Sequence, residues 1–248
     1  MKKNKQENGC RELTLRQTAK YLQKHDNYII LTHASPDGDT LGSAFALYYA
    51  LKEIGKAACV ICPDVIPEKY NYFARQTDHV SRDDATVVAV DVADKRLLGG
   101  LEEEFGDIVD LNIDHHISNV RFAKNLFLDA DAAATAESMY ELLGIMKVNI
   151  NDVTAKALYT GIATDTGCFK YSNVTAKTHM IVAQLYEYNI DASEINRIMF
   201  DTKSRKLLEL ERMVLDASEF HFGGKCIILP VTAEMQEKTG CSGTELEG

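Results

Sequence analysis

Short apolar runs rich in β-branched residues alternate with longer amphipathic stretches in the first half of the chain. The apolar runs cover residues 28–32, 57–61, 86–90 and 108–113. Runs of this length predict strands buried on both faces, and their alternation with helical patterns indicates parallel βαβ units. A further short run at residues 126–128 predicts an edge strand.

Helical apolar spacing fills the intervals between these runs and most of the second half of the chain. It predicts helices over residues 13–24, with Thr14 as N-cap, and over 40–54, 67–73, 95–104, 133–143, 151–163, 174–188 and 192–200. In the second of these helices, the small residues Gly42 and Ser43 are expected to permit close backbone approach to a functional site.

The C-terminal part of the chain has a different pattern. The charged residues 201–212 predict a solvated helical connector, and apolar runs on either side of Gly223 and Gly224 predict a hairpin over residues 217–229. We therefore expect an α/β protein with three parts. They are a parallel-sheet domain with flanking helices over residues 12–190, a helical connector over 191–215, and the beginning of a smaller α/β domain over 216–248.

Acidic and histidine side chains gather where the predicted strands end. They are His33, Asp37 and Asp39; Asp91; Asp114, His115 and His116; and, after a predicted helix, Asp165. Each cluster alone has a plain explanation as a turn, a polar surface or a helix cap. Their joint occurrence favours a single site, because side chains beyond the carboxyl ends of parallel strands converge on one crevice.

The residue types in these clusters suit a pair of divalent cations. Carboxylates with neutral imidazoles and no cysteine favour Mn²⁺, with Mg²⁺ and Co²⁺ as alternatives, over a thiolate zinc site. Two ions about 3.5 to 4 Å apart can activate water for displacement at phosphorus. A pair this close needs a bridging carboxylate, and Asp91 is predicted as the bridge because it stands alone after its strand. Asp37 and Asp39 can then point toward different ions.

Four motifs carry a resemblance to a known family. They read Leu31-Thr-His-Ala-Ser-Pro-Asp-Gly-Asp-Thr-Leu-Gly-Ser43, Val90-Asp-Val-Ala-Asp94, Asp114-His-His-Ile-Ser-Asn119 and Gly161-Ile-Ala-Thr-Asp-Thr-Gly167. Over residues 12–248 the chain resembles the DHH phosphoesterase superfamily, in particular its NrnA-like branch. The resemblance implies an enzyme that hydrolyses short oligoribonucleotides, 3′-phosphoadenosine 5′-phosphate (pAp), or both.

The resemblance also implies a role for each site residue. It assigns His33, Asp37 and Asp91 to one metal, and Asp39, Asp91, His115 and Asp165 to the other. Asp91 and His116 would be the catalytic residues, with His116 facing the substrate phosphate.

Four further residues have supporting roles by position. Asp114 would orient an imidazole, and Asp94 would support the metal ligands without binding a metal itself. Arg96 and Lys170 are expected to contact phosphate.

Charge and targeting signals narrow the partners. The formal net charge of −10 argues against a broad basic face for long nucleic acid and favours a small phosphorylated nucleotide or short RNA. The chain shows neither a signal peptide nor a membrane span, so the expected location is the cytoplasm and no membrane partner is expected; a homodimer is left open. Cys59 and Cys62 have redox-like spacing but are predicted to be structural residues of a strand.

Several alternatives stay open at this point. They are hydrolysis of the linear dinucleotide pApA or of cyclic di-AMP, inorganic pyrophosphatase activity, and a non-catalytic nucleotide-binding module. The sequence stops at Gly248, soon after the first hairpin of what the resemblance implies to be a C-terminal DHHA1 domain. We therefore expect this form to be truncated within that substrate-binding domain.

Overall fold

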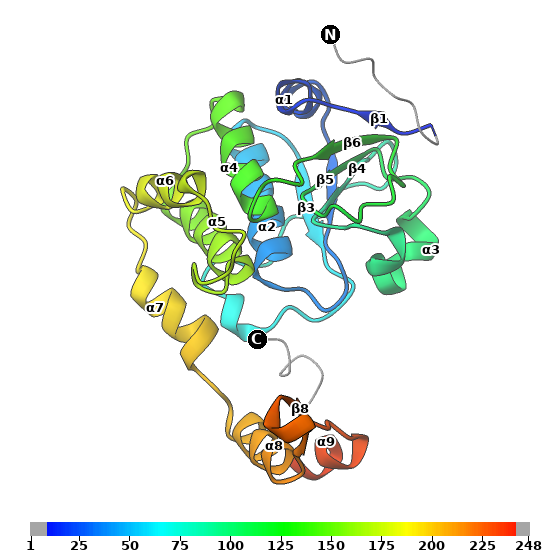
Figure 1. Cartoon of the computed structure of the whole chain (residues 1–248). Helices are drawn as coiled ribbons and strands as arrows, with labels where there is room; N and C mark the ends of the chain where they lie inside the picture. The colour runs from blue at the N-terminus through cyan, green and yellow to red at the C-terminus, as the bar shows by residue number, and fades with distance from the viewer. Residues whose placement is uncertain (1–8, 242–248) are drawn as a thin grey trace. The chain divides into compact units, whose positions relative to one another are not determined.

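The first part of the chain is built on a six-stranded parallel sheet. The computed structural model describes residues 9–241. The strand order is β1-β6-β5-β4-β2-β3, and every pair is parallel (Figure 1). The strands are β1 Arg11–Glu12, β2 Tyr28–Leu31, β3 Ala58–Ile61, β4 Thr86–Val90, β5 Leu111–Asp114 and β6 Asn125–Leu128.

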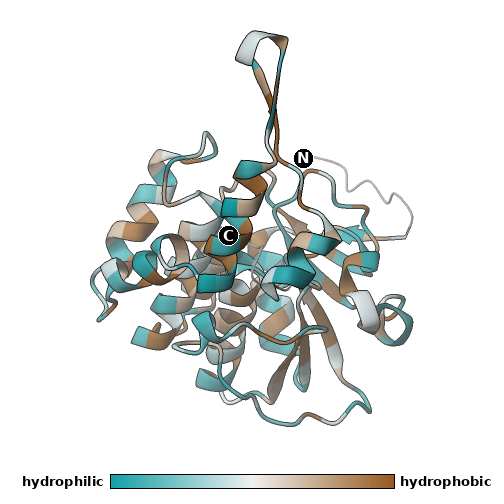
Figure 2. Cartoon of the chain, turned by 90° about the horizontal axis from the view of Figure 1, so that it is seen from below, coloured by the Kyte–Doolittle hydropathy of each residue, from teal (hydrophilic) through white to brown (hydrophobic). Residues whose placement is uncertain are grey.

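Helices cover both faces of this sheet, as a parallel sheet with buried strands requires. The α-helices are α1 Leu15–Lys24, α2 Gly38–Glu53, α3 Glu102–Phe105, α4 Thr135–Met146, α5 Asp152–Asp165, α6 Ala176–Leu185 and α7 Ala192–Asn196. Helices α2, α4 and α5 lie on one side of the sheet and α3 on the other (Figure 1). The strands are largely apolar, whereas the helices carry polar residues on their outer sides (Figure 2). The predicted α/β class is confirmed.

The side of the sheet that faces α3 has its own apolar core. Ile29 and Leu31 of β2 and Val87 and Ala89 of β4 point into it and pack with Phe105. These positions alternate along each strand, so the residues between them face α2. Burial on both faces explains why the strands read as continuous apolar runs in the sequence.

Helix α2 approaches α5 closely at Gly42. A Cβ atom on Gly42 would lie 2.4 Å from the carbonyl oxygen of Ala157, and a Cβ atom on Gly161 would lie 2.9 Å from Oδ1 of Asp39. Only glycine fits at these two crossing points. The close approach at Gly42 is thus made by the backbone of α5, and it holds the start of α2 beside the end of α5.

Local signals set several helix boundaries correctly. Thr14 caps α1 through a capping box with Gln17, as the sequence predicts. Asn151 caps α5.

Two predicted helices differ in the structure. The predicted helix at residues 67–73 is only one 3₁₀ turn, η1 Glu68–Tyr70. The predicted helix at 95–104 is a 3₁₀ segment, η2 Lys95–Leu101, followed by α3, because Gly99 interrupts it at φ 53°.

One strand prediction needs correction, and one strand was not predicted. Residues 126–128 do form part of a strand, but β6 lies inside the sheet, because β1 pairs with it and takes the edge. The two-residue strand β1 was not predicted, since a segment this short has no periodicity.

The predicted helix at 192–200 is α7 followed by a π-helical turn, Arg197–Asp201.

The chain divides into two compact units, Met1–Asn196 and Arg197–Gly248. The second unit contains α8 Arg205–Asp216, the antiparallel pair β7 Glu219–His221 and β8 Cys226–Ile228, and α9 Ala233–Thr239. The predicted hairpin is confirmed. Within residues 9–241, no helix has both the length and the apolar character that crossing a membrane requires.

Candidate metal centre

The candidate site lies where the order of strands along the chain reverses direction. The chain leaves β2 toward β3 on one side of the sheet, whereas it leaves β4, the other neighbour of β2, toward β5 on the opposite side. Such a switch point is where open α/β sheets place their ligands. His33 follows β2, Asp91 follows β4, and His115 follows β5 directly. The last residue of α5, Asp165, joins them.

Seven of the predicted site residues come together in three overlapping groups. They are His33, Asp37 and Asp91; Asp39, His115 and Asp165; and Asp91, His115 and His116. Within each group the potential ligand atoms all lie within 4.8 Å of one another. All six residues predicted as metal ligands are therefore close enough to share a two-ion site.

Asp91 occupies the centre of this arrangement. Its Oδ2 lies 3.8 Å from Nε2 of His33, and its Oδ1 lies 3.7 Å from Nε2 of His115. The side chain is thus placed between two imidazoles, with one oxygen toward each. Asp91 has a positive φ of 60°, a conformation that costs free energy for a residue with a side chain. The turn after β4 is held in this conformation, which directs the carboxylate into the crevice.

Backbone amides at the start of α4 hold Asp39. The N–H groups of Thr135 and Ala136 donate to the two Asp39 oxygens at 2.6 and 2.9 Å, and the Ser43 hydroxyl donates at 3.2 Å. The positive end of a helix favours a negative charge here. The Thr135 hydroxyl also donates to Oδ1 of Asp91 at 2.7 Å. Sequence reasoning missed Thr135, whose only signal was its position at the start of a predicted helix.

The two inward-facing histidines are oriented by backbone carbonyls. Nδ1 of His33 lies 2.7 Å from the carbonyl oxygen of Ala34, and Nδ1 of His115 lies 3.1 Å from that of Ala132. Each Nδ1 therefore donates a proton, which leaves the Nε2 lone pair for a metal. Nε2 of His115 is buried and has no hydrogen-bond partner in the described part of the chain. A cation would satisfy this atom.

The electrostatics of the site also fit a cation. Burial raises the pKa of Asp39 and of Asp91 above the usual range, and neighbouring carboxylates raise them further. Burial, together with Asp39, raises the pKa of Asp165 to about 7. Carboxylates crowded in this way repel one another unless they are protonated or share a positive ion. The ligand atoms are mainly carboxylate oxygens with two imidazole nitrogens, a set that fits hard divalent cations able to bind imidazole.

Asp114 contacts His116 and the backbone around it. Its Oδ1 accepts from Nδ1 of His116 at 2.7 Å and from the His115 amide at 2.8 Å, while Asn119 donates to its Oδ2 at 2.6 Å. The hydrogen bond with Asp114 raises the pKa of His116. The His116 side chain is 42% exposed, compared with 12% for His115. His116 therefore lies at the mouth of the site.

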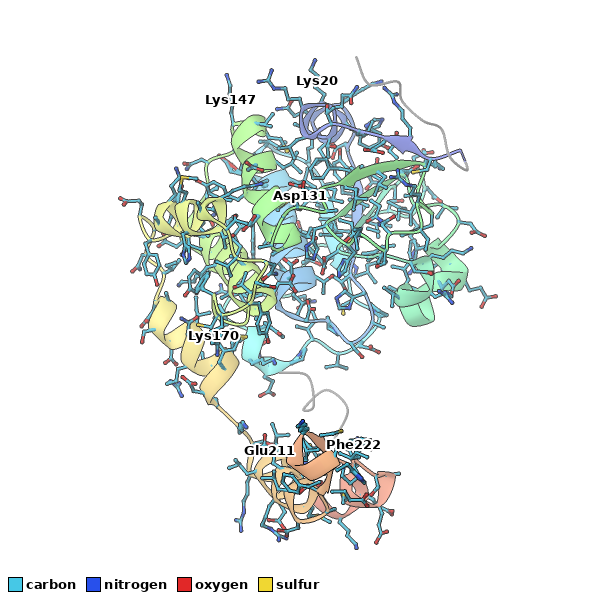
Figure 3. All side chains as sticks on the ribbon, in the orientation of Figure 1. Lys20, Asp131, Lys147, Lys170, Glu211 and Phe222 are labelled. Atoms are coloured by element: carbon cyan, nitrogen blue, oxygen red, sulfur yellow. The ribbon has the colours of Figure 1, made fainter. Side chains whose placement is uncertain are left out.

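Arg96 and Lys170, the residues expected to contact phosphate, lie on two different segments of the chain. Nε and Nη2 of Arg96 both donate to Oδ2 of Asp94, at 3.0 and 2.6 Å. Asp94 also accepts from the Arg96 amide, so this carboxylate caps η2 and clamps Arg96. The two residues line a pocket of about 370 Å³ with Ser118. Lys170 is exposed in the turn after α5 (Figure 3).

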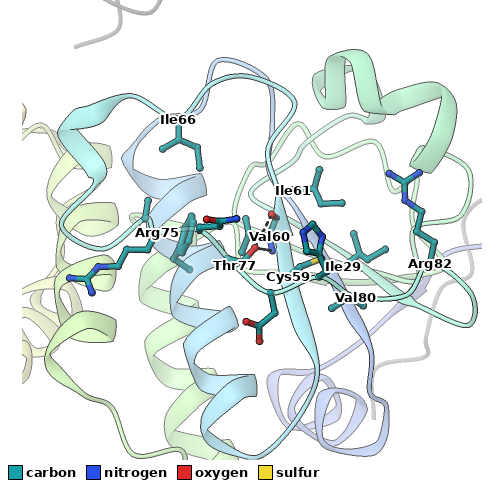
Figure 4. Close-up of a pocket in the computed structure, with 14 residues that line it drawn as sticks. Ile29, Cys59, Val60, Ile61, Ile66, Arg75, Thr77, Val80 and Arg82 are labelled. Carbon is teal, nitrogen blue, oxygen red and sulfur yellow. Dashed lines mark hydrogen bonds between the residues drawn. The ribbon is translucent and has the colours of Figure 1, made fainter.

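A larger cavity of about 510 Å³ lies beside β3, with none of the predicted ligands in its lining (Figure 4). Thr77 is part of it, and its hydroxyl accepts from the Val60 amide at 3.1 Å. The segment around Thr77 thus covers the edge of the sheet in place of another strand. Cys59 lies in β3 as a free thiol, and burial raises its pKa, as expected for a structural cysteine.

The chain is similar in sequence to known proteins. A model of the DHH family, N-terminal domain, matches residues 27–162. The bifunctional oligoribonuclease and PAP phosphatase NrnA of Thermus thermophilus is 35% identical, covering 85% of this chain and 64% of that protein. The NrnA protein of Bacillus subtilis is 28% identical, over 73% of this chain and 59% of that one. The chain thus spans about three fifths of the length of these two curated relatives.

Solved structures agree on the fold. An exopolyphosphatase-related protein from Bacteroides fragilis superposes with a TM-score of 0.83 at 24% identity, covering 94% of this chain and 74% of that one. A putative family II inorganic pyrophosphatase of Methanococcus jannaschii gives a TM-score of 0.55 at 21% identity, covering 80% of this chain and 68% of that one. The family match, over more than half of the sequence, shows that the chain belongs to the DHH family.

Proposed function

We propose that this protein is a metal-dependent phosphoesterase that hydrolyses short oligoribonucleotides, pAp, or both. The observation that carries the proposal is the central position of Asp91, with one carboxylate oxygen toward His33 and the other toward His115. This placement suits a bridging ligand between two ions. The names of the Thermus and Bacillus relatives supply the substrate class.

In the proposed mechanism six side chains would hold two Mn²⁺ ions. His33, Asp37 and Asp91 would hold one, and Asp39, Asp91, His115 and Asp165 would hold the other. When bound, the ions supply an activated water and positive charge for the phosphoryl oxygens. Asp39 keeps its orientation through the amides of α4, so the site is organised before substrate arrives.

His116 supplies the proton in this proposal. Asp114 holds its Nδ1–H and favours the protonated ring, so a proton on Nε2 can pass to the leaving oxygen. The same charge stabilises the phosphoryl oxygens as negative charge develops. Arg96 and Lys170 are proposed to bind the remaining phosphate oxygens, with the Arg96 guanidinium held in place by Asp94.

A second candidate is hydrolysis of inorganic pyrophosphate. A probable manganese-dependent inorganic pyrophosphatase of Enterococcus faecalis is 24% identical over 80% of this chain. Its substrate has no base or sugar, so the two candidates differ in what must be recognised beside the metals. This difference makes them separable by a simple substrate comparison.

Turnover of pAp, a 5′-labelled RNA dimer and pyrophosphate tests the proposal. Each is measured with added Mn²⁺, after chelation with EDTA, and after Mn²⁺ is restored. We expect hydrolysis of pAp or the dimer that disappears on chelation and returns with Mn²⁺. Hydrolysis of pyrophosphate alone would support the second candidate, and binding of nucleotides without any turnover would indicate a non-catalytic module.

A further inference from the structure

The turn that follows Asp165 adopts a conformation that L-residues rarely take. Gly167, Cys168 and Phe169 are consecutive and all have positive φ, at 54°, 56° and 64°. For the two residues with side chains this costs free energy, and such strain persists only where the surroundings impose it. The Phe169 ring packs between Tyr159 and His179, which anchors the turn.

This turn places the ring of Tyr171 over the backbone of Gly167. A Cβ atom on Gly167 would lie 2.3, 2.4 and 2.7 Å from Cζ, Cε1 and Cε2 of Tyr171. These similar distances to three ring atoms mean that one ring face covers Gly167. Tyr171 is nevertheless 61% exposed. One face of the ring is therefore supported by the backbone, while much of the side chain is open to solvent.

The segment that carries Tyr171 is tied to the metal centre at two points. The Asn173 side chain donates to the carbonyl of Asp165, the predicted ligand, at 3.0 Å. It also donates at 3.0 Å to the carbonyl of Ala133, next to the residue that orients His115. The amide of Tyr171 donates to the carbonyl of Thr166. The exposed ring is thus carried by a segment that is hydrogen-bonded to the backbone at Asp165 and Thr166.

We propose that Tyr171 is a stacking platform for a nucleobase of the substrate, whose phosphate lies at the metal centre. Single-stranded nucleotides are commonly recognised by stacking on an aromatic ring, which tolerates any base. A ring already supported on one face loses little conformational freedom when a base covers the other. The inference rests on the proposed function and narrows it to substrates that carry a base, because inorganic phosphates offer nothing to stack.

The test compares two ligands that differ only in the base. Binding of AMP and of ribose 5-phosphate is measured by calorimetry on the full chain with Mn²⁺. We expect AMP to bind roughly 5- to 150-fold more tightly, the range that one stacked base supplies. Tyr171→Ala should remove most of this preference, and Tyr171→Phe should keep it.

Two further variants separate stacking from a structural role. Tyr171→Leu covers Gly167 with an apolar side chain but has no ring, so it should fold and still lose the AMP preference. Met180→Ala removes an apolar side chain of the same exposure, 61%, from α6 and should change nothing. An undiminished preference in both Tyr171→Ala and Tyr171→Leu would overturn the inference.

The outcome is distinguishable from failure of the proposed function. Turnover of pAp or the RNA dimer together with equal binding of AMP and ribose 5-phosphate would reject the stacking role alone. A Tyr171-dependent preference for AMP in a protein that turns over none of these substrates would reject the phosphoesterase and keep the base site.

Discussion

At the scale of single residues, the geometry around Asp91 explains how the four aspartates and two histidines predicted as metal ligands can share one site. Its oxygens face His33 and His115, and Asp37 and Asp39 belong to different groups of potential ligands. Asp37 and Asp39 can belong to different groups although only two positions separate them, because Asp37 is the N-cap of α2 and Asp39 lies in its first turn. Their side chains therefore point in different directions.

His116→Ala should keep its metals and lose turnover. The His116 ring is partly exposed and hydrogen-bonded to Asp114, so we expect it to contact the substrate phosphate and not a metal. Removing such a contact typically lowers kcat on the order of 10²- to 10³-fold. Metal analysis and kinetics on the same preparation check this. A variant that had lost an ion would show instead that His116 is a metal ligand.

Thr135→Val should weaken metal binding without unfolding the protein. Valine keeps the shape of the side chain and the amide that binds Asp39, but it loses the hydroxyl that donates to Asp91. Loss of a group that orients a ligand typically costs about 10- to 100-fold in metal affinity. Thr135→Ser keeps the hydroxyl and is the matched control. Equal Mn²⁺ affinity in all three proteins, measured by titration, would contradict the role of Thr135.

The sequence predicted the residues with a chemical signature and missed those without one. Carboxylates and imidazoles after strands indicate a metal site on their own. Thr135 donates to Asp91 from another segment, and a threonine does not mark a site in a sequence. Such a partner depends on which loops meet in space. Asn119 belongs to the same motif as Asp114, but its residue type alone does not reveal that it donates to that carboxylate.

At the scale of elements, the crossing of α2 and α5 sets the site. Gly42→Ala would push a methyl group to within 2.4 Å of the Ala157 carbonyl oxygen, so the two helices would have to separate. We expect a loss of about 1 to 3 kcal/mol in the free energy of unfolding. Mn²⁺ affinity should fall with it, because α2 carries Asp39 and α5 carries Asp165.

Gly144→Ala is the control for this prediction. Gly144 is an exposed residue of α4, and a Cβ atom there would meet nothing within 4 Å. Alanine should therefore stabilise the helix by about 0.5 to 1 kcal/mol. Urea unfolding of both variants checks the pair. A Gly42→Ala protein as stable as Gly144→Ala would show that the crossing has room to adjust.

The sequence predicted where most strands lie along the chain, but not the order in which they pair in the sheet. β2 and β4 are buried on both faces, so their apolar runs stand out. The pairing of β6 with β1 joins segments more than a hundred residues apart, which local periodicity does not record. The π-helical turn at Arg197–Asp201 is likewise invisible in a helical pattern.

At the scale of the whole molecule, charge and composition bear on the size of the substrate. The chain carries 37 acidic and 27 basic residues, and a long strand would need many phosphate contacts. We therefore expect the protein to digest RNA of a few nucleotides faster than long strands, releasing mononucleotides. Rates on a labelled length series, from a dimer to a long single strand, check this. Processive digestion of the long strand would contradict it.

The number of bound metal ions tests whether Asp91 bridges two cations. We expect two Mn²⁺ per chain in the purified wild-type protein after loading and desalting. Asp91→Ala should lose both, because each ion would lose a shared ligand, whereas Asp37→Ala and Asp39→Ala should each lose one first. Mass spectrometry of the metals in the four proteins gives the answer. An Asp91→Ala protein that keeps two tightly bound ions would contradict a centre bridged by Asp91.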